Sequence, residues 1–258
     1  MEIVICRTYE ALSQAAARVV ADLVNRKPNA VLGFATGSSP LGLYKELLRL
    51  HKEKGLDFSA VTTFNLDEYV GLPGDHPQSY RHFMNENLFN HIHVPMQNTH
   101  VPSGTSANHA AFCESYEKRI RECGGIDLQI LGIGSDGHIA FNEPGSSLGS
   151  RTRMVTLTEQ TMDDNARFFK KKSDVPRHAI SMGVGTILEA RRLLMVVNGK
   201  NKAAALAAAV EGPITSMIMA SALQLHPDAI VFADEDAAAG LKMRDYYDWI
   251  QKQARIKP

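Results

Sequence analysis

The chain has 258 residues, of which 44% are hydrophobic and 22% are charged, a balance typical of a globular protein. A chain of this length buries one sizeable core, so we expect a single domain over residues 1–258. The 28 basic and 28 acidic residues cancel to a formal net charge of zero. The bulk charge therefore gives no reason to expect nucleic acid or an anionic membrane as a partner.

The cysteines and the apolar runs of the sequence indicate the cellular compartment of the protein. Cys6, Cys113 and Cys123 are odd in number and far apart, which favours a reducing compartment over a disulfide framework or a structural zinc site. The first six residues have the pattern of a strand rather than of a secretory signal. No apolar run approaches the roughly 20 residues that cross a bilayer. We therefore predict a cytoplasmic protein with no membrane partner.

The first part of the chain alternates strand-like apolar runs with helical spacing. Residues 2–7 predict a strand, and residues 9–25 predict a helix. Residues 30–35 predict a second strand, and Pro40 then opens a helix that runs to about residue 51, because proline suits the first helical turn. Residues 61–65 predict a third strand that runs into Leu66-Asp67-Glu68-Tyr69.

The alternation continues to the end of the chain. Residues 79–89 and 107–123 have helical spacing, and the apolar run 127–131 predicts a buried strand before a glycine-rich loop. Residues 193–197 and 229–232 predict two more buried strands, each followed by an alanine-rich helix.

Strands separated by helices indicate the fold class. They imply a parallel sheet covered by helices on both faces. We predict an α/β fold with a doubly wound, mostly parallel sheet in a three-layer αβα sandwich, which is a Rossmann-like architecture. Residues 145–180 are the least regular part of the chain, and we expect there a lid-like excursion or a solvated surface segment.

The glycine-rich loop at residues 132–144 carries the strongest chemical signal. It places three glycines and the side chains Asp136, His138 and Glu143 directly after a buried strand. Glycines allow a sharp turn and a close ligand, and carboxylates around a histidine orient an acid–base imidazole. Two alternatives are a His–Asp pair that only staples the loop, and a metal site. A metal site usually needs another histidine or cysteine at tight spacing, so we expect no metal.

Two other strand ends carry candidate residues. Thr36-Gly37-Ser38-Ser39-Pro40 lies between a strand and the start of a helix, where backbone N–H groups and the helix dipole favour a phosphate. The alternative is a plain turn with a serine cap. Asp67 follows the third strand, and a carboxylate there faces the same crevice as the other loops unless it is only a turn acid.

Isolated basic and histidine residues are weaker signals. Arg167 lies in the irregular segment, and Lys202 follows the strand at 193–197. A lone cation is normally a solvated surface charge, so either becomes a phosphate ligand only if it converges on the Ser38 turn. His91 and His93 form a close pair beside a proline, which favours a surface turn over a metal site.

Taken together, these motifs resemble the glucosamine-6-phosphate deaminase family over nearly the whole chain and in the same order. The matching segments are residues 65–72 (Asn-Leu-Asp-Glu-Tyr-Val-Gly-Leu), 136–144 (Asp-Gly-His-Ile-Ala-Phe-Asn-Glu-Pro), 150–153, 165–169 and 210–212. The resemblance implies an αβα sandwich and an enzyme that converts glucosamine 6-phosphate and water into fructose 6-phosphate and ammonia. It implies no cofactor, and a small sugar phosphate as the partner.

The resemblance also implies a role for each candidate residue. Asp67 is the base that removes the C2 proton, and His138 opens the sugar ring. Asp136 and Glu143 orient and polarise His138. The residues that hold the phosphate are Ser38, Ser39, Arg167 and Lys202.

Two other functions stay open, as does regulation. A 6-phosphogluconolactonase shares an Asp-Gly-His loop but lacks the Phe-Asn-Glu-Pro continuation found here, and a non-catalytic sugar-phosphate sensor normally carries an added DNA-binding helix-turn-helix.

Some family members are activated by N-acetylglucosamine 6-phosphate, and Ser146, Arg153 and Thr156 match their activator site. Val155 stands where those members have a lysine, so we predict weak or absent activation. The sequence leaves a homo-oligomer open.

Overall fold

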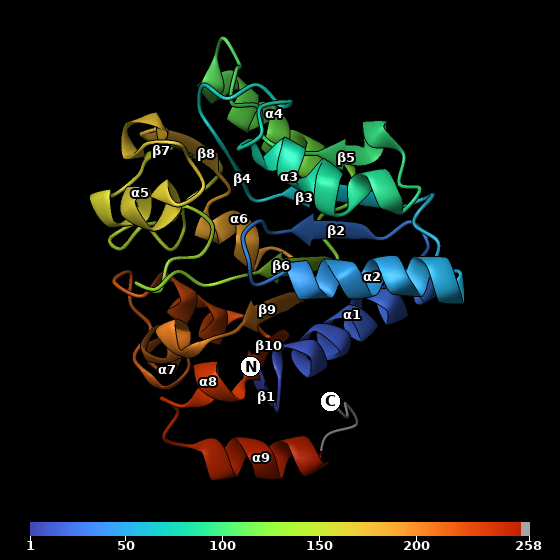
Figure 1. The fold of residues 1–258 in the computed structure, drawn as a ribbon, viewed down its shortest axis with the longest axis vertical. Helices are drawn as coiled ribbons and strands as arrows, with labels where there is room; N and C mark the ends of the chain where they lie inside the picture. The colour runs from blue at the N-terminus through green and yellow to red at the C-terminus, as the bar shows by residue number, and fades with distance from the viewer. Residues whose placement is uncertain (254–258) are drawn as a thin grey trace.

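The computed structural model describes residues 1–253, and its centre is a seven-stranded sheet. Every neighbouring pair of strands in this sheet is parallel. Figure 1 shows the strands from bottom to top in the order β1 (Glu2–Cys6), β10 (Ala229–Asp234), β9 (Leu193–Val197), β6 (Leu128–Leu131), β2 (Val31–Phe34), β3 (Thr62–Asn65) and β5 (Thr99–His100). The predicted α/β fold with a mostly parallel sheet is confirmed.

The strand order reverses between β2 and β6. From β2 the chain adds β3 and β5 on one side, and it then returns to add β6 and β9 on the other. In doubly wound sheets, ligands bind beyond the carboxyl ends of the strands at such a switch point. The loops that follow β2 and β6 are those around Ser38 and His138, so the topology brings these two predicted loops to one crevice.

Helices cover both faces of the sheet, because successive residues of each strand point to opposite sides. In β9, Leu193 and Met195 belong to one buried cluster, whereas Leu194 and Val196 belong to the other. One cluster includes side chains of α1 (Tyr9–Arg26), α2 (Leu41–Lys54) and α3 (Tyr80–Asn87). The opposite cluster includes those of α4 (His109–Glu122), α6 (Val184–Leu188), α7 (Ala203–Glu211) and α8 (Glu235–Ala238).

Helix ends follow local chemistry. The Thr8 hydroxyl accepts a hydrogen bond from Ala11 N–H at the start of α1, as a cap does. The helix that we predict after Pro40 is present, but it continues past residue 51 and ends at Gly55, whose φ of +69° suits glycine. The last helix, α9 (Arg244–Gln253), packs beside the edge strand β1, where Ile5 N–H donates to the side chain of Gln251.

A second, antiparallel sheet lies beside the first, and the sequence analysis missed it. Its strand order is β4 (Asp67–Tyr69), β8 (His178–Ser181), β7 (Arg153–Thr156). Between β7 and β8 lies α5 (Glu159–Ala166). Residues 145–180, which we expect to be the least regular part of the chain, thus contain two strands and a helix, and a lid-like role for this segment stays a prediction. These strands have three or four residues each, which is too short for periodicity to identify.

The other helical segments among residues 1–253 are five short 3-10 helices: Phe89–His91, Met96–Asn98, Lys172–Asp174, Lys200–Lys202 and Met219–Leu225. Among residues 1–253, none of the helices has the length and apolar character needed to span a membrane.

Candidate active site

The predicted site residues meet at a cavity of about 720 Å³ at the carboxyl ends of the central strands. Six of the eight predicted catalytic and phosphate-binding residues line it: Ser38, Ser39, Asp67, His138, Arg167 and Lys202. The other two, Asp136 and Glu143, do not line the cavity, but their carboxylates lie beside Nδ1 of His138. Arg167 and Lys202 thus line the same cavity as the Ser38 turn, as phosphate ligands must, and their role as phosphate ligands stays a prediction.

The loop after β6 folds back on itself around the ring of His138. Gly134 N–H donates to the carbonyl oxygen of His138 at 2.9 Å. A Cβ atom on Gly134 would lie 2.4 Å from Nδ1 and Cε1 of the imidazole. Gly137 has a φ of +88°, which favours glycine. The glycines therefore allow the imidazole to lie directly against the loop that carries it.

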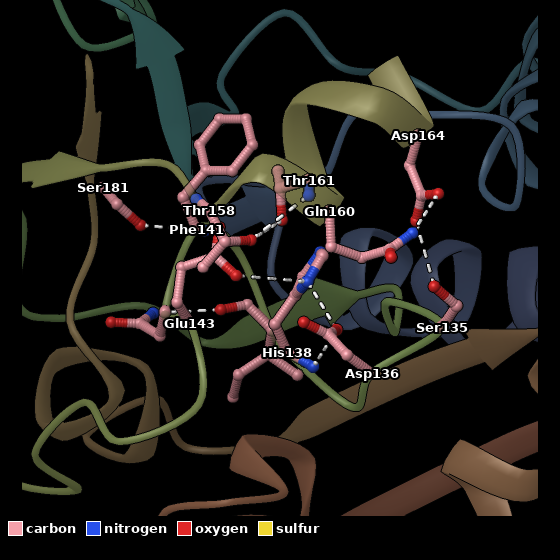
Figure 2. A network of polar contacts seen from close by, with 12 residues as sticks. Ser135, Asp136, His138, Phe141, Glu143, Thr158, Gln160, Thr161, Asp164 and Ser181 are labelled. Atoms are coloured by element: carbon pink, nitrogen blue, oxygen red, sulfur yellow. Dashed lines mark hydrogen bonds and ion pairs between the residues drawn. The ribbon is translucent and has the colours of Figure 1, made fainter. Parts of the chain in front are cut away.

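Two carboxylates face the same nitrogen of His138, as Figure 2 shows. Nδ1 lies 2.7 Å from Oδ1 of Asp136 and 4.0 Å from Oε2 of Glu143. Oε2 of Glu143 is buried and has no hydrogen-bond partner in the described part of the chain. Because Nδ1 faces the carboxylates, Nε2 on the other edge of the ring is the nitrogen left for a ligand.

The two carboxylates are held by the backbone. Oδ1 of Asp136 accepts a hydrogen bond from the N–H of His138 at 3.1 Å, and Oε1 of Glu143 accepts one from Thr158 at 3.1 Å. Burial acts to raise the pKa of Asp136, but the hydrogen bonds and the charge of His138 outweigh it and hold that pKa below its usual value. Asp136 is therefore an anion at neutral pH, and its carboxylate lies 2.7 Å from Nδ1 of His138.

Asp67 lies on another wall of the cavity as the first residue of β4, and its exposed fraction is 5%. Burial, and then the negative charge of Glu68, raise its pKa to about 8. Glu68 has a separate function: its carboxylate accepts hydrogen bonds from Ser79 Oγ, Tyr80 N–H and Arg81 N–H at 2.7 to 3.0 Å. It therefore caps α3, while Asp67 faces the cavity as a strong base.

Two cations and the start of a helix line the same cavity and are the candidates for binding an anion. Gly37, with a φ of +97°, turns the chain into Ser38 and Ser39 ahead of α2. Burial lowers the pKa of Lys202, and the charge of Asp164 acts against that shift. The Arg167 guanidinium lies 4.7 Å from the ring centre of Phe168. Backbone N–H groups, a lysine and an arginine form a typical phosphate site.

Comparison with known proteins agrees with this geometry. A family model for glucosamine-6-phosphate isomerases and 6-phosphogluconolactonases matches residues 7–232. The chain belongs to the glucosamine-6-phosphate isomerase/6-phosphogluconolactonase family. It is 51% identical to a glucosamine-6-phosphate deaminase of Shewanella halifaxensis over 251 residues, which cover 97% of this chain and 95% of that protein.

Solved structures of two kinds share the fold. A monomeric glucosamine-6-phosphate deaminase superposes with a TM-score of 0.92 and is 47% identical, covering 93% of this chain and 100% of its own. The 6-phosphogluconolactonase of Trypanosoma brucei has a TM-score of 0.74 but is 22% identical, covering 93% of this chain and 98% of its own. The second likeness shows the fold alone.

Sequence reasoning missed the aromatic wall of this family member's cavity. Tyr80 stacks on Phe141 with ring centres 5.9 Å apart and an interplanar angle of 11°, and Tyr69 contacts both rings. All three line the cavity. Tyr69 and Phe141 lie inside segments 65–72 and 136–144, which resemble the family, so the sequence was sufficient to suggest that both line the site. Tyr80 comes from α3, and only the tertiary fold brings it beside them.

The residues that match the activator site of some family members lie outside this cavity lining. Along β7, Arg153 and Val155 are half-buried, whereas Met154 and Thr156 are exposed, as alternation along a strand requires. Nη1 of Arg153 donates to Oδ1 of Asn142 at 2.9 Å. Ser146 follows the Glu143 turn, where its N–H donates to the Glu143 carbonyl.

The sequence raises a metal question at two places. His91 ends the 3-10 helix Phe89–His91, and both it and His93 are exposed, which agrees with the expected surface position. The ligand atoms of Asp136, His138 and Glu143 lie within 4.8 Å of one another, so the trio is suited to a metal as well as to proton transfer. The absence of a metal from the chemistry stays a prediction.

Proposed function

We propose that this protein is a glucosamine-6-phosphate deaminase, which converts glucosamine 6-phosphate and water into fructose 6-phosphate and ammonia. The observation that carries the proposal is one cavity lined by a buried carboxylate, a histidine and a cationic anion site. It occurs in a chain about half identical, over nearly its whole length, to proteins of that name. All the transformations involved are proton transfers and a hydrolysis, so they need no redox cofactor.

His138 opens the sugar ring in this proposal. Its Nε2 takes the proton of the anomeric hydroxyl and returns a proton to the ring oxygen, which yields the open-chain aldehyde. Asp136 and Glu143 stabilise the imidazolium that forms in between, and they hold the ring in one orientation. The 2.7 Å contact between Nδ1 and Asp136 supports this role.

Asp67 then removes the proton from C2. The aldehyde at C1 makes this proton acidic, and the resulting enolamine spreads the charge. Return of the proton to C1 leaves an imine at C2, which water hydrolyses to the ketone with release of ammonia. A carboxylate with a pKa near 8 is a stronger base than an exposed aspartate.

The phosphate is held at the far end of the cavity by Ser38, Ser39, Arg167 and Lys202. Its binding energy positions C1 and C2 between His138 and Asp67, although the phosphate takes no part in bond breaking. We also assign the enzyme to the cytoplasm. Its three free cysteines, two of them buried, support a reducing compartment.

The decisive experiment measures ammonia and fructose 6-phosphate released from glucosamine 6-phosphate by the purified protein. Asp67→Asn should lower this rate by about 10²–10⁴, while binding of inorganic phosphate stays as in wild type. Hydrolysis of 6-phosphogluconolactone without ammonia release would instead favour the lactonase. Sugar-phosphate binding without any turnover would favour the sensor.

A further inference from the structure

The hydroxyl of Tyr9 lies directly behind the Ser38 turn. Tyr9 is the first residue of α1, and its hydroxyl lies 2.9 Å from the carbonyl oxygen of Ser39 and 3.1 Å from that of Ser38. It also accepts a hydrogen bond from Gly42 N–H at 2.7 Å. Tyr9 is absent from the residues that line the cavity, so it contacts the turn from the side opposite to the ligand.

These contacts add to the hydrogen bond that the turn makes within itself, from Leu41 N–H to the carbonyl oxygen of Ser38 at 3.3 Å, and they supply a partner for Gly42 N–H. The first N–H groups of a helix have no partner inside the helix. At the start of α2 the cap residue is Pro40, which makes no side-chain cap hydrogen bond. The phenol oxygen of Tyr9 takes the place of a cap for Gly42 N–H, and its O–H donates to a carbonyl of the turn.

The contact with Ser38 orients one donor of the anion site, whereas the carbonyl of Ser39 precedes Pro40, which has no N–H. In a trans peptide the C=O and the following N–H point in opposite directions. A carbonyl of Ser38 that faces Tyr9 therefore directs the N–H of Ser39 to the other side of the turn, which is the side of the cavity. Without Tyr9 this carbonyl keeps only the longer hydrogen bond from Leu41 N–H at 3.3 Å, so the peptide is held less firmly and rotates more readily to offer its carbonyl oxygen to an anion.

Packing keeps the phenol in this position. A Cβ atom on Gly42 would lie 2.9 Å from Cζ of Tyr9 and 2.1 Å from Oγ of Ser13. Ser13 is buried, and its hydroxyl donates to the backbone oxygen of Tyr9 at 2.7 Å, one turn earlier in α1. The first turn of α2 thus packs directly on the first turns of α1, with no space for a side chain between them.

We propose that Tyr9 is a positioning residue for the anion-binding turn, which sets the affinity of the site for a sugar phosphate without touching it. The inference rests on the proposed function only in placing the phosphate at Ser38 and Ser39. It predicts an effect on binding that is separate from proton transfer at Asp67 and His138.

The test is Tyr9→Phe, which keeps the ring and removes the hydroxyl. Titration calorimetry with inorganic phosphate should show binding weaker by about threefold to tenfold, the effect of losing one or two net hydrogen bonds. The KM for glucosamine 6-phosphate should rise by a similar factor, while kcat stays within about twofold. Tyr246→Phe is the matched control, because it removes the hydroxyl of an exposed tyrosine that does not line the cavity.

Phosphate binding by the variants decides the question. Weaker phosphate binding in Tyr9→Phe but not in Tyr246→Phe supports the proposal, and it does so even if the wild type releases no ammonia, which overturns only the deaminase assignment. Equal binding in Tyr9→Phe and wild type overturns the proposal, as does equal weakening in Tyr9→Phe and Tyr246→Phe. If Tyr9→Phe does not fold, Gly42→Ala combined with Ser13→Ala replaces it, since the new Cβ then displaces Cζ of Tyr9 while the closer contact with Oγ of Ser13 is removed: weaker phosphate binding than in Ser13→Ala alone supports the proposal and equal binding overturns it.

Discussion

The carboxylate of Glu143 accepts a hydrogen bond from the backbone N–H of Thr158 at 3.1 Å. Thr158 is the cap residue of α5, so a side chain that faces His138 is tied to the start of a helix in another segment, as Figure 2 shows. The order of α5 and the position of Glu143 are therefore coupled.

This coupling predicts the effect of Thr158→Ala. The Thr158 hydroxyl accepts from Thr161 N–H at 3.2 Å, and losing such a cap costs about 1 kcal/mol of helix stability. We expect amide hydrogens of α5 to exchange about fivefold faster and kcat to fall several-fold. Thr156→Ala, which removes an exposed hydroxyl from β7, is the control. Faster exchange with unchanged kcat would contradict the coupling.

The pKa of Asp67 predicts a rising pH profile. Because burial and Glu68 raise this pKa to about 8, the ionised base forms only as the pH rises through that value. The value of kcat/KM should therefore increase with pH up to about 8. Glu68→Gln removes one of the two causes, so the acidic limb should move to lower pH. Glu117→Gln, a buried carboxylate outside the cavity lining, should leave it in place.

The same raised pKa means that the ionised carboxylate of Asp67 lowers the stability of the folded protein at high pH. Its pKa is raised from 3.8 to about 8, so folding favours the protonated acid. The stability that this group contributes is present in full below pH 3.8 and is lost as the pH rises through about 8. Asp67→Asn should therefore unfold at a higher temperature than wild type at pH 9, and at a similar one at pH 4. Thermal unfolding at both pH values tests this, and equal midpoints at pH 9 would contradict it.

Asp164 brings a negative charge to the cavity that holds the candidate phosphate ligands. It lines the cavity with Lys202, and it accepts hydrogen bonds from Ser135 Oγ at 3.0 Å and from Gln160 at 2.9 Å. Asp164→Asn should tighten inorganic phosphate binding by about twofold to fivefold, as expected for one partly screened charge. Ser135→Ala loses the hydrogen bond but keeps the charge, so it should not tighten binding. Tightening in both variants would assign the effect to the hydrogen bond.

Regulation by N-acetylglucosamine 6-phosphate should be weak or absent. Val155 brings no cation to the segment that matches the activator site, and Arg153 donates to Asn142. Substrate curves should be close to hyperbolic, and addition of this sugar phosphate should leave them unchanged. Val155→Lys should increase its binding, since a charge-assisted contact is worth roughly 1.5–3 kcal/mol. A sigmoidal curve that becomes hyperbolic with the activator would refute this prediction in the wild type.

The sequence by itself determined the alternation of strands and helices and the main candidate residues. Runs such as residues 193–197 and the turn at Pro40 depend on local periodicity and local turn chemistry, which a short window contains. The glycine loop around His138 was recognisable for the same reason. Because parallel strands end at one edge of a sheet, the sequence was enough to predict that strand-end residues such as Asp67 and Ser38 lie near each other.

Only the tertiary structure decided how distant segments combine. Asp67 pairs with Ser181 in the second sheet, and no local pattern in either short strand predicts that partner. The same holds for the position of Arg167 at the cavity that the Ser38 turn lines, and for the hydroxyl of Tyr9 behind that turn. Such contacts arise because the packing of whole elements brings together residues far apart in the chain. The raised pKa of Asp67 has the same origin, since burial by several elements at once sets the cost of its charge.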